Sequence, residues 1–219
     1  MSIAENIAQV RANIAQACAQ TGRSPEEITL VGASKMNDAA ACREAIAAGI
    51  DALGENRVQE MTAKLADNAY DGAPLHFIGH LQRNKVKQVV GKVALIQSVG
   101  STELLEEIEK VAAKEQLVQN ILLEVNIGRE EAKSGFDPDA VTAAAEAALA
   151  LPHVRVRGLM TIPPADADRD ANMRYFQEVQ ALYVDINTKL FHNELKCLSM
   201  GMSGDYMDAI RCGATMVRV

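Results

Sequence analysis

The stretch ITLVGASKMNDAAACREAIAAGIDALGEN (28–56) contains the unit that decides the fold. It begins with an apolar, β-branched run of strand length (28–34). A segment rich in helix formers follows (39–49), with Gly49 placed to end the helix, and a second short strand comes next (51–56). A strand, a helix and a strand in this order predict a parallel βαβ unit.

The same rhythm continues to the end of the chain. We expect eight strands, over 28–34, 51–56, 74–79, 93–99, 120–126, 154–162, 195–202 and 215–219. A helical segment follows each of the first seven, over 39–49, 58–66, 84–90, 101–116, 137–151, 171–190 and 205–213. The strands are apolar runs, which is typical of parallel strands buried on both faces. Eight such units favour an α/β fold, a single (β/α)8 TIM-type barrel with an extra N-terminal helix over 3–20. A doubly wound open sheet is the alternative, because spacing alone does not show closure.

Length and composition fit one domain that covers residues 1–219. The formal net charge of −7 argues against a dedicated nucleic-acid binder, which needs a basic surface. The apolar stretches fall short of the ~20 residues that a membrane span requires. The N-terminus lacks the basic start and apolar run of a signal peptide. We therefore expect a cytoplasmic protein that binds neither nucleic acid nor membranes.

The residues that end the expected strands are strongly polar, although the strands are apolar. In a (β/α) barrel the functional site forms at the carboxyl ends of the strands. Those ends carry Lys35, Asn56, His80, Ser98, Asn126, Thr161, the run Met202-Ser203-Gly204, and Arg218. Their clustering at one end of the barrel predicts a ligand site.

Lys35 follows the buried run LVGAS directly. A lysine at the end of a buried strand loses hydration, which favours its neutral amine, and a neutral amine attacks aldehydes to form a Schiff base. The alternative is a lysine in a solvated loop.

Ser203 and Gly204 precede the helix expected over 205–213, where backbone amides can donate to phosphate. Ordinary capping of that helix by Ser203 or Asp205 is the alternative. Arg218 at the last strand end suits a phosphate or a pyridine nitrogen, and a surface arginine is the alternative.

Metal binding is not expected. His76 and His80 are interpreted as sharing one face of the third strand, and no third ligand accompanies them, so structural or ring-stacking roles are favoured. The basic cluster over 83–87 reads as a solvated helix face, with an anion-binding surface as the alternative, and Lys133 reads as exposed. The scattered cysteines read as reduced thiols: Cys18, Cys42, Cys197 and Cys212.

Several blocks together resemble the pyridoxal 5′-phosphate (PLP) homeostasis proteins, single-domain relatives of the alanine racemase barrel. The resemblance runs from about residue 28 to the end, with a leading helix before it. It is carried by LVGASK (30–35), GENRVQE (54–60), HFIGHLQRNKVK (76–87), LEVNIGREEAKSGF (123–136), RGLMTIPP (157–164) and LSMGMSGDYMDAIRCGATMVRV (198–219).

The resemblance implies a role for each candidate residue. Lys35 is the Schiff-base lysine, Asn56 lies near the cofactor ring, Ser203 and Gly204 hold the phosphate, and Arg218 sits by the pyridine nitrogen. An arginine there keeps that nitrogen unprotonated and weakens PLP as an electron sink. The family implies a monomeric PLP carrier in vitamin B6 homeostasis and amino-acid balance, without catalytic residues, which passes PLP to PLP-dependent apo-enzymes.

Two departures from the family pattern stand out. The stretch after the lysine reads MNDAAA (36–41), which alters the loop over the cofactor. Family members continue after the last strand with a Gly-Thr segment and a helix, whereas this sequence ends at Val219. We therefore expect a phosphate contact and the closing helix to be missing.

Two other functions remain as alternatives. A PLP-dependent amino-acid racemase or decarboxylase needs a second acid/base group on the opposite face of the ring, and Tyr206 is the one tyrosine near an expected strand end. A binding or regulatory module without a cofactor is the third possibility, and the polar strand ends argue against it.

Overall fold

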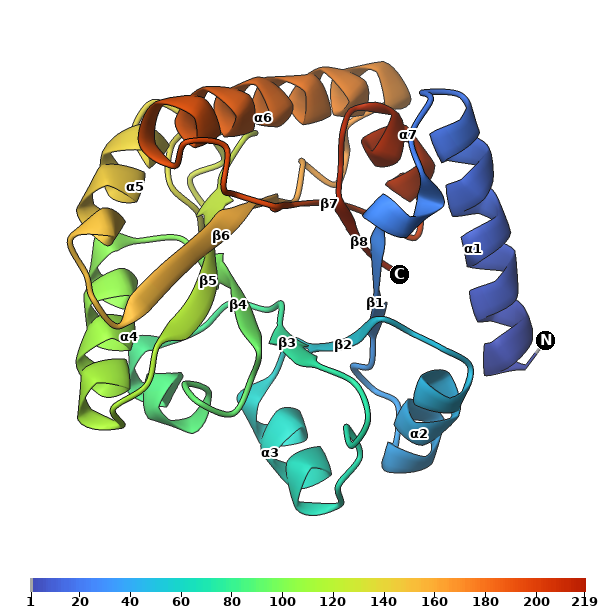
Figure 1. Ribbon diagram of the computed structural model, residues 1–219, viewed down its shortest axis with the longest axis horizontal. Coiled ribbons are helices and arrows are strands. Elements are labelled where there is room, and N and C mark those ends of the chain that lie inside the picture. The colour runs from blue at the N-terminus through green and yellow to red at the C-terminus, as the bar shows by residue number, and fades with distance from the viewer. Residues whose placement is uncertain (1) are drawn as a thin grey trace.

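The computed structural model describes residues 2–219 and contains a closed barrel of eight parallel strands in sequential order (Figure 1). The strand β8 pairs with β1 and closes the ring, which confirms the predicted barrel over the open sheet. The strands are β1 (Thr29–Ala33), β2 (Ala52–Glu55), β3 (Leu75–Phe77), β4 (Leu95–Val99), β5 (Gln119–Val125), β6 (Val154–Thr161), β7 (Cys197–Met202) and β8 (Met216–Arg218).

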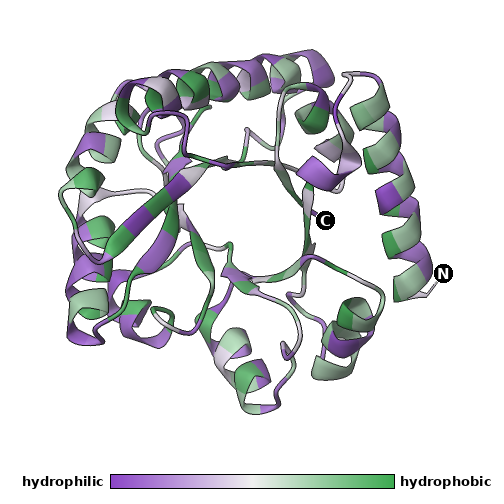
Figure 2. Cartoon of the chain, in the orientation of Figure 1, coloured by the Kyte–Doolittle hydropathy of each residue, from purple (hydrophilic) through white to green (hydrophobic). Residues whose placement is uncertain are grey.

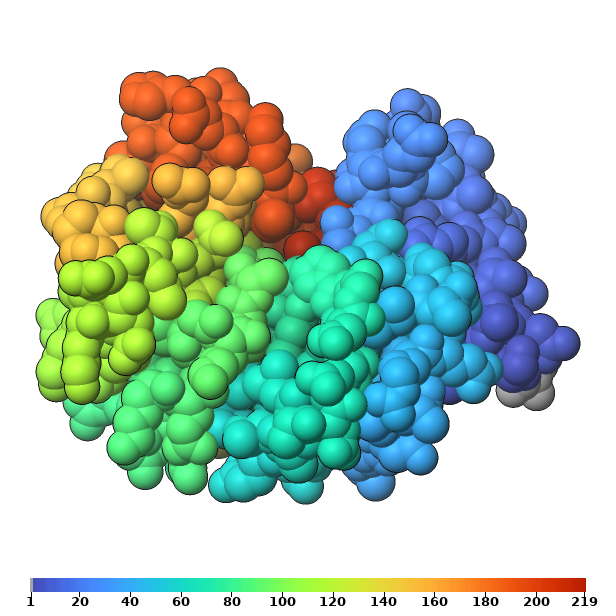
Figure 3. All heavy atoms as spheres, turned by 60° about the horizontal axis from the view of Figure 1, so that its bottom comes forward, coloured from blue at the N-terminus to red at the C-terminus, as the bar shows by residue number. Residues whose placement is uncertain are grey.

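Helices form an outer layer around the strands, and consecutive segments of the chain lie side by side around the molecule (Figures 1 and 3). Each outer helix carries both hydrophobic and hydrophilic residues (Figure 2). The α-helices are α1 (Ile3–Ala19), α2 (Ala39–Ala47), α3 (Val58–Ala66), α4 (Thr102–Lys114), α5 (Val141–Leu149), α6 (Arg169–Leu190) and α7 (Tyr206–Arg211). Two short 3₁₀ segments are η1 (Pro25–Glu27) and η2 (Arg83–Gln88).

Two helical segments differ from their predictions. The segment after β3 is the 3₁₀ helix η2, although an α-helix is expected from its composition. The helix α5 begins at Val141, four residues later than the start predicted at 137. The preceding residues form a turn instead, because the carbonyl of Asp137 accepts from the amide of Ala140 at 2.9 Å and its carboxylate pairs with Arg129 at 2.7 Å.

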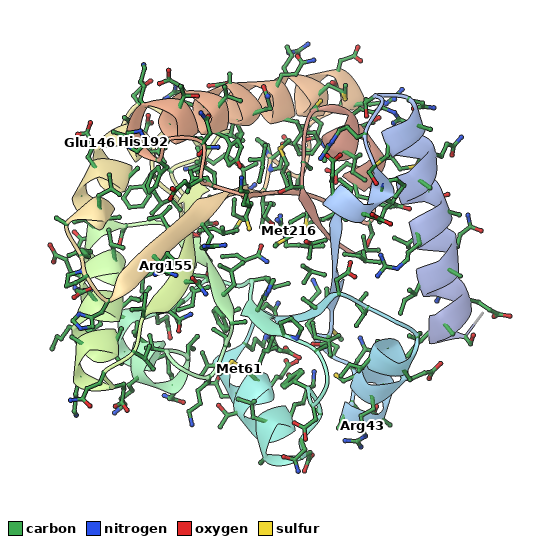
Figure 4. All side chains as sticks on the ribbon, viewed as in Figure 1. Arg43, Met61, Glu146, Arg155, His192 and Met216 are labelled. Carbon is green, nitrogen blue, oxygen red and sulfur yellow. The ribbon has the colours of Figure 1, made fainter. Side chains whose placement is uncertain are left out.

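The barrel has two apolar cores, because successive side chains of a strand point to opposite faces. The larger core lies between strands and helices. The smaller core fills the barrel interior, where Met216 of β8 lies near the centre (Figure 4). It consists of Val31, Ala52, Leu95, Leu122, Met160 and Met216.

Polar side chains complete the interior. They are His76, Gln97, Ser199 and Arg218, and each is buried. Buried polar groups need hydrogen-bond partners. These four side chains therefore hold defined positions inside the barrel, beneath the carboxyl ends of the strands.

Two further predictions concern the whole chain. Among residues 2–219, no helix has the length and apolarity that a membrane crossing requires. The four cysteines are free thiols, as predicted.

Candidate functional site

A cavity of ≈ 420 Å³ lies at the carboxyl ends of the strands, within the ~300–1,000 Å³ range typical of small-molecule sites. It brings together residues that follow seven different strands. The cavity is lined by Ala33, Lys35, Asn56, Ile78, Gly79, His80, Glu124, Val125, Asn126, Lys133, Ser134, Ile162, Met202, Ser203, Arg218 and Val219. Of the five predicted cofactor-binding residues, Lys35, Asn56, Ser203 and Arg218 line the cavity, and Gly204 does not.

Lys35 lies two residues beyond β1, in a turn, and its side chain lines the cavity. It is exposed, so the loss of hydration expected from its place after a buried strand is not found here. The main chain of the turn is nevertheless ordered by hydrogen bonds. The side-chain amide of Asn37 donates to the carbonyl of Lys35 at 3.2 Å. The lysine is therefore accessible from solvent on a fixed main chain.

Asn56 follows β2 directly, and its Oδ1 atom is buried without a hydrogen-bond partner among the described residues. Gly79 lies against it so closely that a Cβ atom there would come within 2.3 Å of the Asn56 carbonyl oxygen. Only glycine allows this approach. An unsatisfied buried acceptor on the cavity wall is explained by a ligand that donates to it.

Arg218 ends β8 and is 4% exposed, which excludes the surface-arginine alternative. Its guanidinium donates to Ser199 Oγ at 2.5 Å and to the Thr161 carbonyl at 3.0 Å. Burial lowers the pKa of Arg218 to about 10, while the charges of Glu124 and Asp205 act in the opposite direction. A guanidinium has five N–H donors, so donors remain for an acceptor in the cavity.

A chain of hydrogen bonds continues from Ser199 through the barrel interior. Ser199 Oγ donates to Gln97 Oε1 at 2.7 Å, and Gln97 Nε2 lies 3.0 Å from His76 Nδ1. Since the Gln97 amide nitrogen is a donor, His76 accepts on Nδ1 and carries its proton on Nε2. Burial lowers the pKa of His76 to about 4, which keeps the ring neutral.

The prediction that His76 and His80 share a strand face is wrong. The strand β3 ends at Phe77, so His80 lies in the following loop, exposed at the cavity mouth, while His76 is buried inside the barrel. In the described part of the chain, no three His, Cys, Asp or Glu side chains come together as a metal site.

Ser203 and Gly204 are the central residues of an exposed turn that the amide of Asp205 closes by donating to the Met202 carbonyl at 3.0 Å. The turn itself does not use the amides of its two central residues. Ser203 lines the cavity, and Gly204 lies beside it with open space around its Cα atom. The Asp205 side chain accepts from the Met202 amide at 2.6 Å and does not cap α7. This arrangement leaves backbone donors for an anion.

The sequence reasoning missed Glu124. This residue of β5 is 8% exposed and accepts from Ser134 Oγ at 3.2 Å. Burial raises the pKa of Glu124, against the opposing influence of Ser134, His80 and Arg218. A charged residue inside the apolar run LLEV (122–125) was the available signal.

Lys133 is also placed differently from its prediction. It is half-buried and lines the cavity, whereas the sequence suggested an exposed loop residue. Its Nζ atom pairs with Glu130 at 2.6 Å and donates to the Pro163 carbonyl at 3.2 Å. The loop folds back because the amide of Asn126 donates to the carbonyl of Phe136 at 2.9 Å.

A second cavity of ≈ 510 Å³ adjoins the first and shares His80, Lys133 and Ser134 with it. Arg83, from the basic cluster over 83–87, lines this cavity, and Lys87 is exposed as predicted for a solvated face.

Tyr206 faces away from both cavities. It is buried at the start of α7, and its hydroxyl accepts from Asn13 Nδ2 of α1 at 2.8 Å. The tyrosine that sequence reasoning considered as a second acid/base group therefore contacts the N-terminal helix. The titratable side chains that line the main cavity belong to Lys35, His80, Glu124, Lys133 and Arg218.

Comparisons with known proteins cover the whole chain, beyond the expected start near residue 28. The family model for the alanine racemase N-terminal domain matches residues 6–219. The pyridoxal phosphate homeostasis protein of Aquifex aeolicus is 41% identical over 219 residues, covering 100% of this chain and 96% of that protein. A solved structure of an unknown protein from Bifidobacterium adolescentis has 35% identity and a TM-score of 0.92, covering 99% of this chain and 92% of that one. PipY of Synechococcus elongatus, solved with PLP bound, has 33% identity and a TM-score of 0.81, covering 94% and 97%.

Proposed function

Since this chain belongs to the family of pyridoxal phosphate homeostasis proteins, we propose that it binds PLP in the cavity at the carboxyl ends of its strands and takes part in vitamin B6 homeostasis and amino-acid balance. One observation carries the proposal. A primary amine, an unsatisfied buried amide oxygen, a hydroxyl group and a buried guanidinium line a single cavity, from Lys35, Asn56, Ser203 and Arg218.

Lys35 is the residue that tethers the cofactor. When bound, PLP would supply an aldehyde, with which the neutral amine of Lys35 would condense to a Schiff base with loss of water, and addition of water would reverse the step. Because the Lys35 side chain is exposed at the cavity mouth, water and an incoming acceptor can reach it. This accessibility suits a protein that holds and releases PLP.

The other residues orient the cofactor. The hydroxyl of Ser203 and the amides of Ser203 and Gly204 donate to the phosphate, because the turn leaves those donors free. Arg218 presents its remaining donors to the pyridine nitrogen, and Asn56 Oδ1 accepts from a donor near the ring. An arginine beside that nitrogen leaves it unprotonated, which disfavours carbanion chemistry.

We propose binding without robust catalysis. Tyr206, the one tyrosine near an expected strand end, accepts a hydrogen bond from Asn13 of α1 and does not line the cavity. We further propose that the chain forms one PLP-binding domain over 1–219, acts in the cytoplasm as a monomer, and supplies PLP-dependent apo-enzymes.

A spectroscopic experiment tests the proposal. The purified protein is mixed with PLP, its visible spectrum is recorded before and after borohydride reduction, and the label is located by mass spectrometry. We expect a Schiff-base band and a label on Lys35, and no band in Lys35→Ala. Lys133→Ala is the matched control, since Lys133 lines the same cavity. A band that persists in Lys35→Ala, or a label confined to Lys133, contradicts the proposal.

A separate experiment tests the racemase or decarboxylase alternative. Glu124 and His80 line the cavity and are candidate acid/base groups for such a reaction. The PLP-loaded protein is incubated with single amino acids in deuterium oxide. Exchange of the α-proton at the rate of free PLP supports a carrier. Rapid exchange that Glu124→Gln abolishes favours an enzyme.

A further inference from the structure

Neighbouring residues in the segment after β1 face opposite sides of the barrel wall. Val31 lies in the interior core, and Lys35, four residues on, lines the cavity. Ser34, the first residue after β1, points outward: its hydroxyl donates to Glu55 Oε1, and its carbonyl accepts from Lys64 of α3. Ser34, the residue before Lys35, therefore makes its contacts on the outer side of the barrel wall.

The buried ion pair between Lys64 and Glu55 forms hydrogen bonds with Ser34. Lys64 Nζ of α3 donates to the Ser34 carbonyl at 2.7 Å and contacts Glu55 Oε1 at 2.5 Å. The hydroxyl of Ser34 donates to the same Glu55 oxygen at 2.7 Å. Tyr70 also donates to it, at 3.1 Å. Glu55 is 0% exposed and Lys64 is 8% exposed, so water does not compete for these contacts.

The ion pair links the first two strands to α3 at one point. Glu55 is the last residue of β2, and the amide of Ser34 donates to the β2 carbonyl of Gly54 at 2.9 Å. Breaking a buried ion pair leaves an uncompensated charge, which is costly. The Glu55 and Lys64 side chains therefore stay in contact and hold Ser34 in position.

A second anchor holds the residue on the other side of the lysine. The amide of Met36 donates to Glu60 Oε2 of α3 at 3.1 Å. Met36 has a φ of 62°, a left-handed conformation that a residue with a side chain adopts at some cost. The contact with Glu60 compensates for that cost. Arg57 pairs with the other oxygen of Glu60 at 3.4 Å and does not reach the turn itself.

The helix that carries Lys64 and Glu60 is itself fixed. Its residues Met61 and Val58 are 0% and 5% exposed, packed in the core between helices and strands, and Met61 lies on the side of α3 that faces the barrel (Figure 4). The Glu55–Lys64 pair and Glu60 therefore fix the turn that contains Lys35 relative to the barrel wall.

We propose that Glu55, Lys64 and Glu60 are positioning residues for the Lys35 amine. The Glu55–Lys64 pair fixes the main chain before the lysine, and Glu60 fixes it after the lysine. The Lys35 side chain stays free in solvent while its Cα atom keeps one place relative to the cavity. This inference rests on the proposed Schiff-base role of Lys35.

The contact between Glu60 and the Met36 amide gives a matched pair of variants, because Glu60 is half-buried and its ion-pair partner Arg57 is exposed. Glu60→Ala removes the acceptor of the Met36 amide, and Arg57→Ala removes the Glu60 ion pair while keeping that acceptor. We expect the equilibrium constant for imine formation at Lys35 to fall about ten-fold in Glu60→Ala, since the main-chain amide loses a charged acceptor. In Arg57→Ala the change stays within about two-fold, as for an exposed ion pair. Arg57→Ala should keep the wild-type melting temperature, whereas Glu60→Ala should lower it slightly, because the left-handed turn loses the contact that compensates for its cost.

The buried anchor is tested with Lys64→Met and its matched control Tyr70→Phe, since each removes one donor to Glu55 and only Lys64 also holds Ser34. We expect both to lower the melting temperature of the protein without PLP. Imine formation should fall at least about ten-fold in Lys64→Met and by less than about two-fold in Tyr70→Phe. Should Lys64→Met fail to fold, the comparison of Glu60→Ala with Arg57→Ala decides the matter.

A measurement without the cofactor separates this inference from the proposed function. Amide hydrogen exchange of the segment 34–37 is followed by mass spectrometry in the protein without PLP. Faster exchange in Glu60→Ala and Lys64→Met, with wild-type exchange in Arg57→Ala, supports the anchors even if wild-type protein forms no imine. Unchanged exchange, together with unchanged imine formation in both anchor variants, overturns them.

Discussion

The guanidinium of Arg218 donates to the hydroxyl oxygen of Ser199 at 2.5 Å, inside the barrel and beneath the cavity. The two residues lie on the adjacent strands β8 and β7, and the Ser199 hydroxyl in turn donates to Gln97 Oε1. Ser199 therefore sets the direction in which the buried guanidinium presents its remaining donors.

Ser199→Ala should weaken PLP binding about ten-fold and cost about 2 kcal/mol of folding free energy, because a bond to a charged group is lost and Gln97 Oε1 is left unsatisfied. Titration of the Schiff-base band and urea unfolding measure the two effects. Thr215→Val is the control, since Thr215 Oγ1 donates to Lys196 at the opposite end of the barrel. The role given to Ser199 fails if both variants lose stability equally and neither loses affinity for PLP.

His76 should make stability depend on acid pH. Its folded-state pKa of about 4 lies below the ordinary value of 6.5, so the unfolded state binds the proton first. The stability is complete above pH 6.5 and falls by roughly 3 kcal/mol as the pH drops toward 4. Urea unfolding at a series of pH values measures the profile.

His76→Gln should flatten that profile. The exposed His192, labelled in Figure 4, provides the control variant His192→Asn, which should keep the wild-type pH dependence. A wild-type slope that survives in His76→Gln would assign the effect to another group.

Two buried glutamates should respond oppositely to replacement by glutamine. Glu55 pairs with Lys64, so Glu55→Gln leaves a buried cation and should destabilise the fold by about 3 kcal/mol. Burial raises the pKa of Glu124, so its ionised form is disfavoured in the fold and Glu124→Gln should raise the melting temperature at pH 8.

The sign of the Glu124 effect can be checked with pH. The gain in Glu124→Gln should narrow as the pH falls toward the ordinary value of 4.5, where the wild-type carboxyl becomes neutral in both states. Thermal unfolding at pH 8 and pH 4 measures it. A loss of stability at pH 8 would show that the attraction between Glu124 and Arg218 outweighs burial.

Ser203→Asp should separate the phosphate end of the cofactor from the aldehyde end. A carboxylate at this turn repels the phosphate, so PLP binding should weaken at least about ten-fold. Pyridoxal, which has the same aldehyde and no phosphate, should bind the variant and the wild type equally. Competition titrations of both compounds give the comparison, and an equal loss for both would place the phosphate elsewhere.

The sequence alone determined the architecture and the end of the barrel where the site lies. Apolar runs and helix formers act locally, so their alternation specified eight strands with a helical segment after each of the first seven, without knowledge of contacts. The resemblance across several blocks named the family, which the comparisons confirm. The position of Lys35, Asn56 and Arg218 at the carboxyl ends of strands followed from the same pattern.

Only the tertiary structure decided which of those side chains are buried and which groups face them. Lys35 is exposed and Arg218 is buried, although both follow apolar runs, because Lys35 lies beyond its strand while Arg218 points into the barrel. Ser199 meets Gln97 across 102 positions of the chain. Such contacts depend on strand register and on closure of the barrel, which no local pattern specifies.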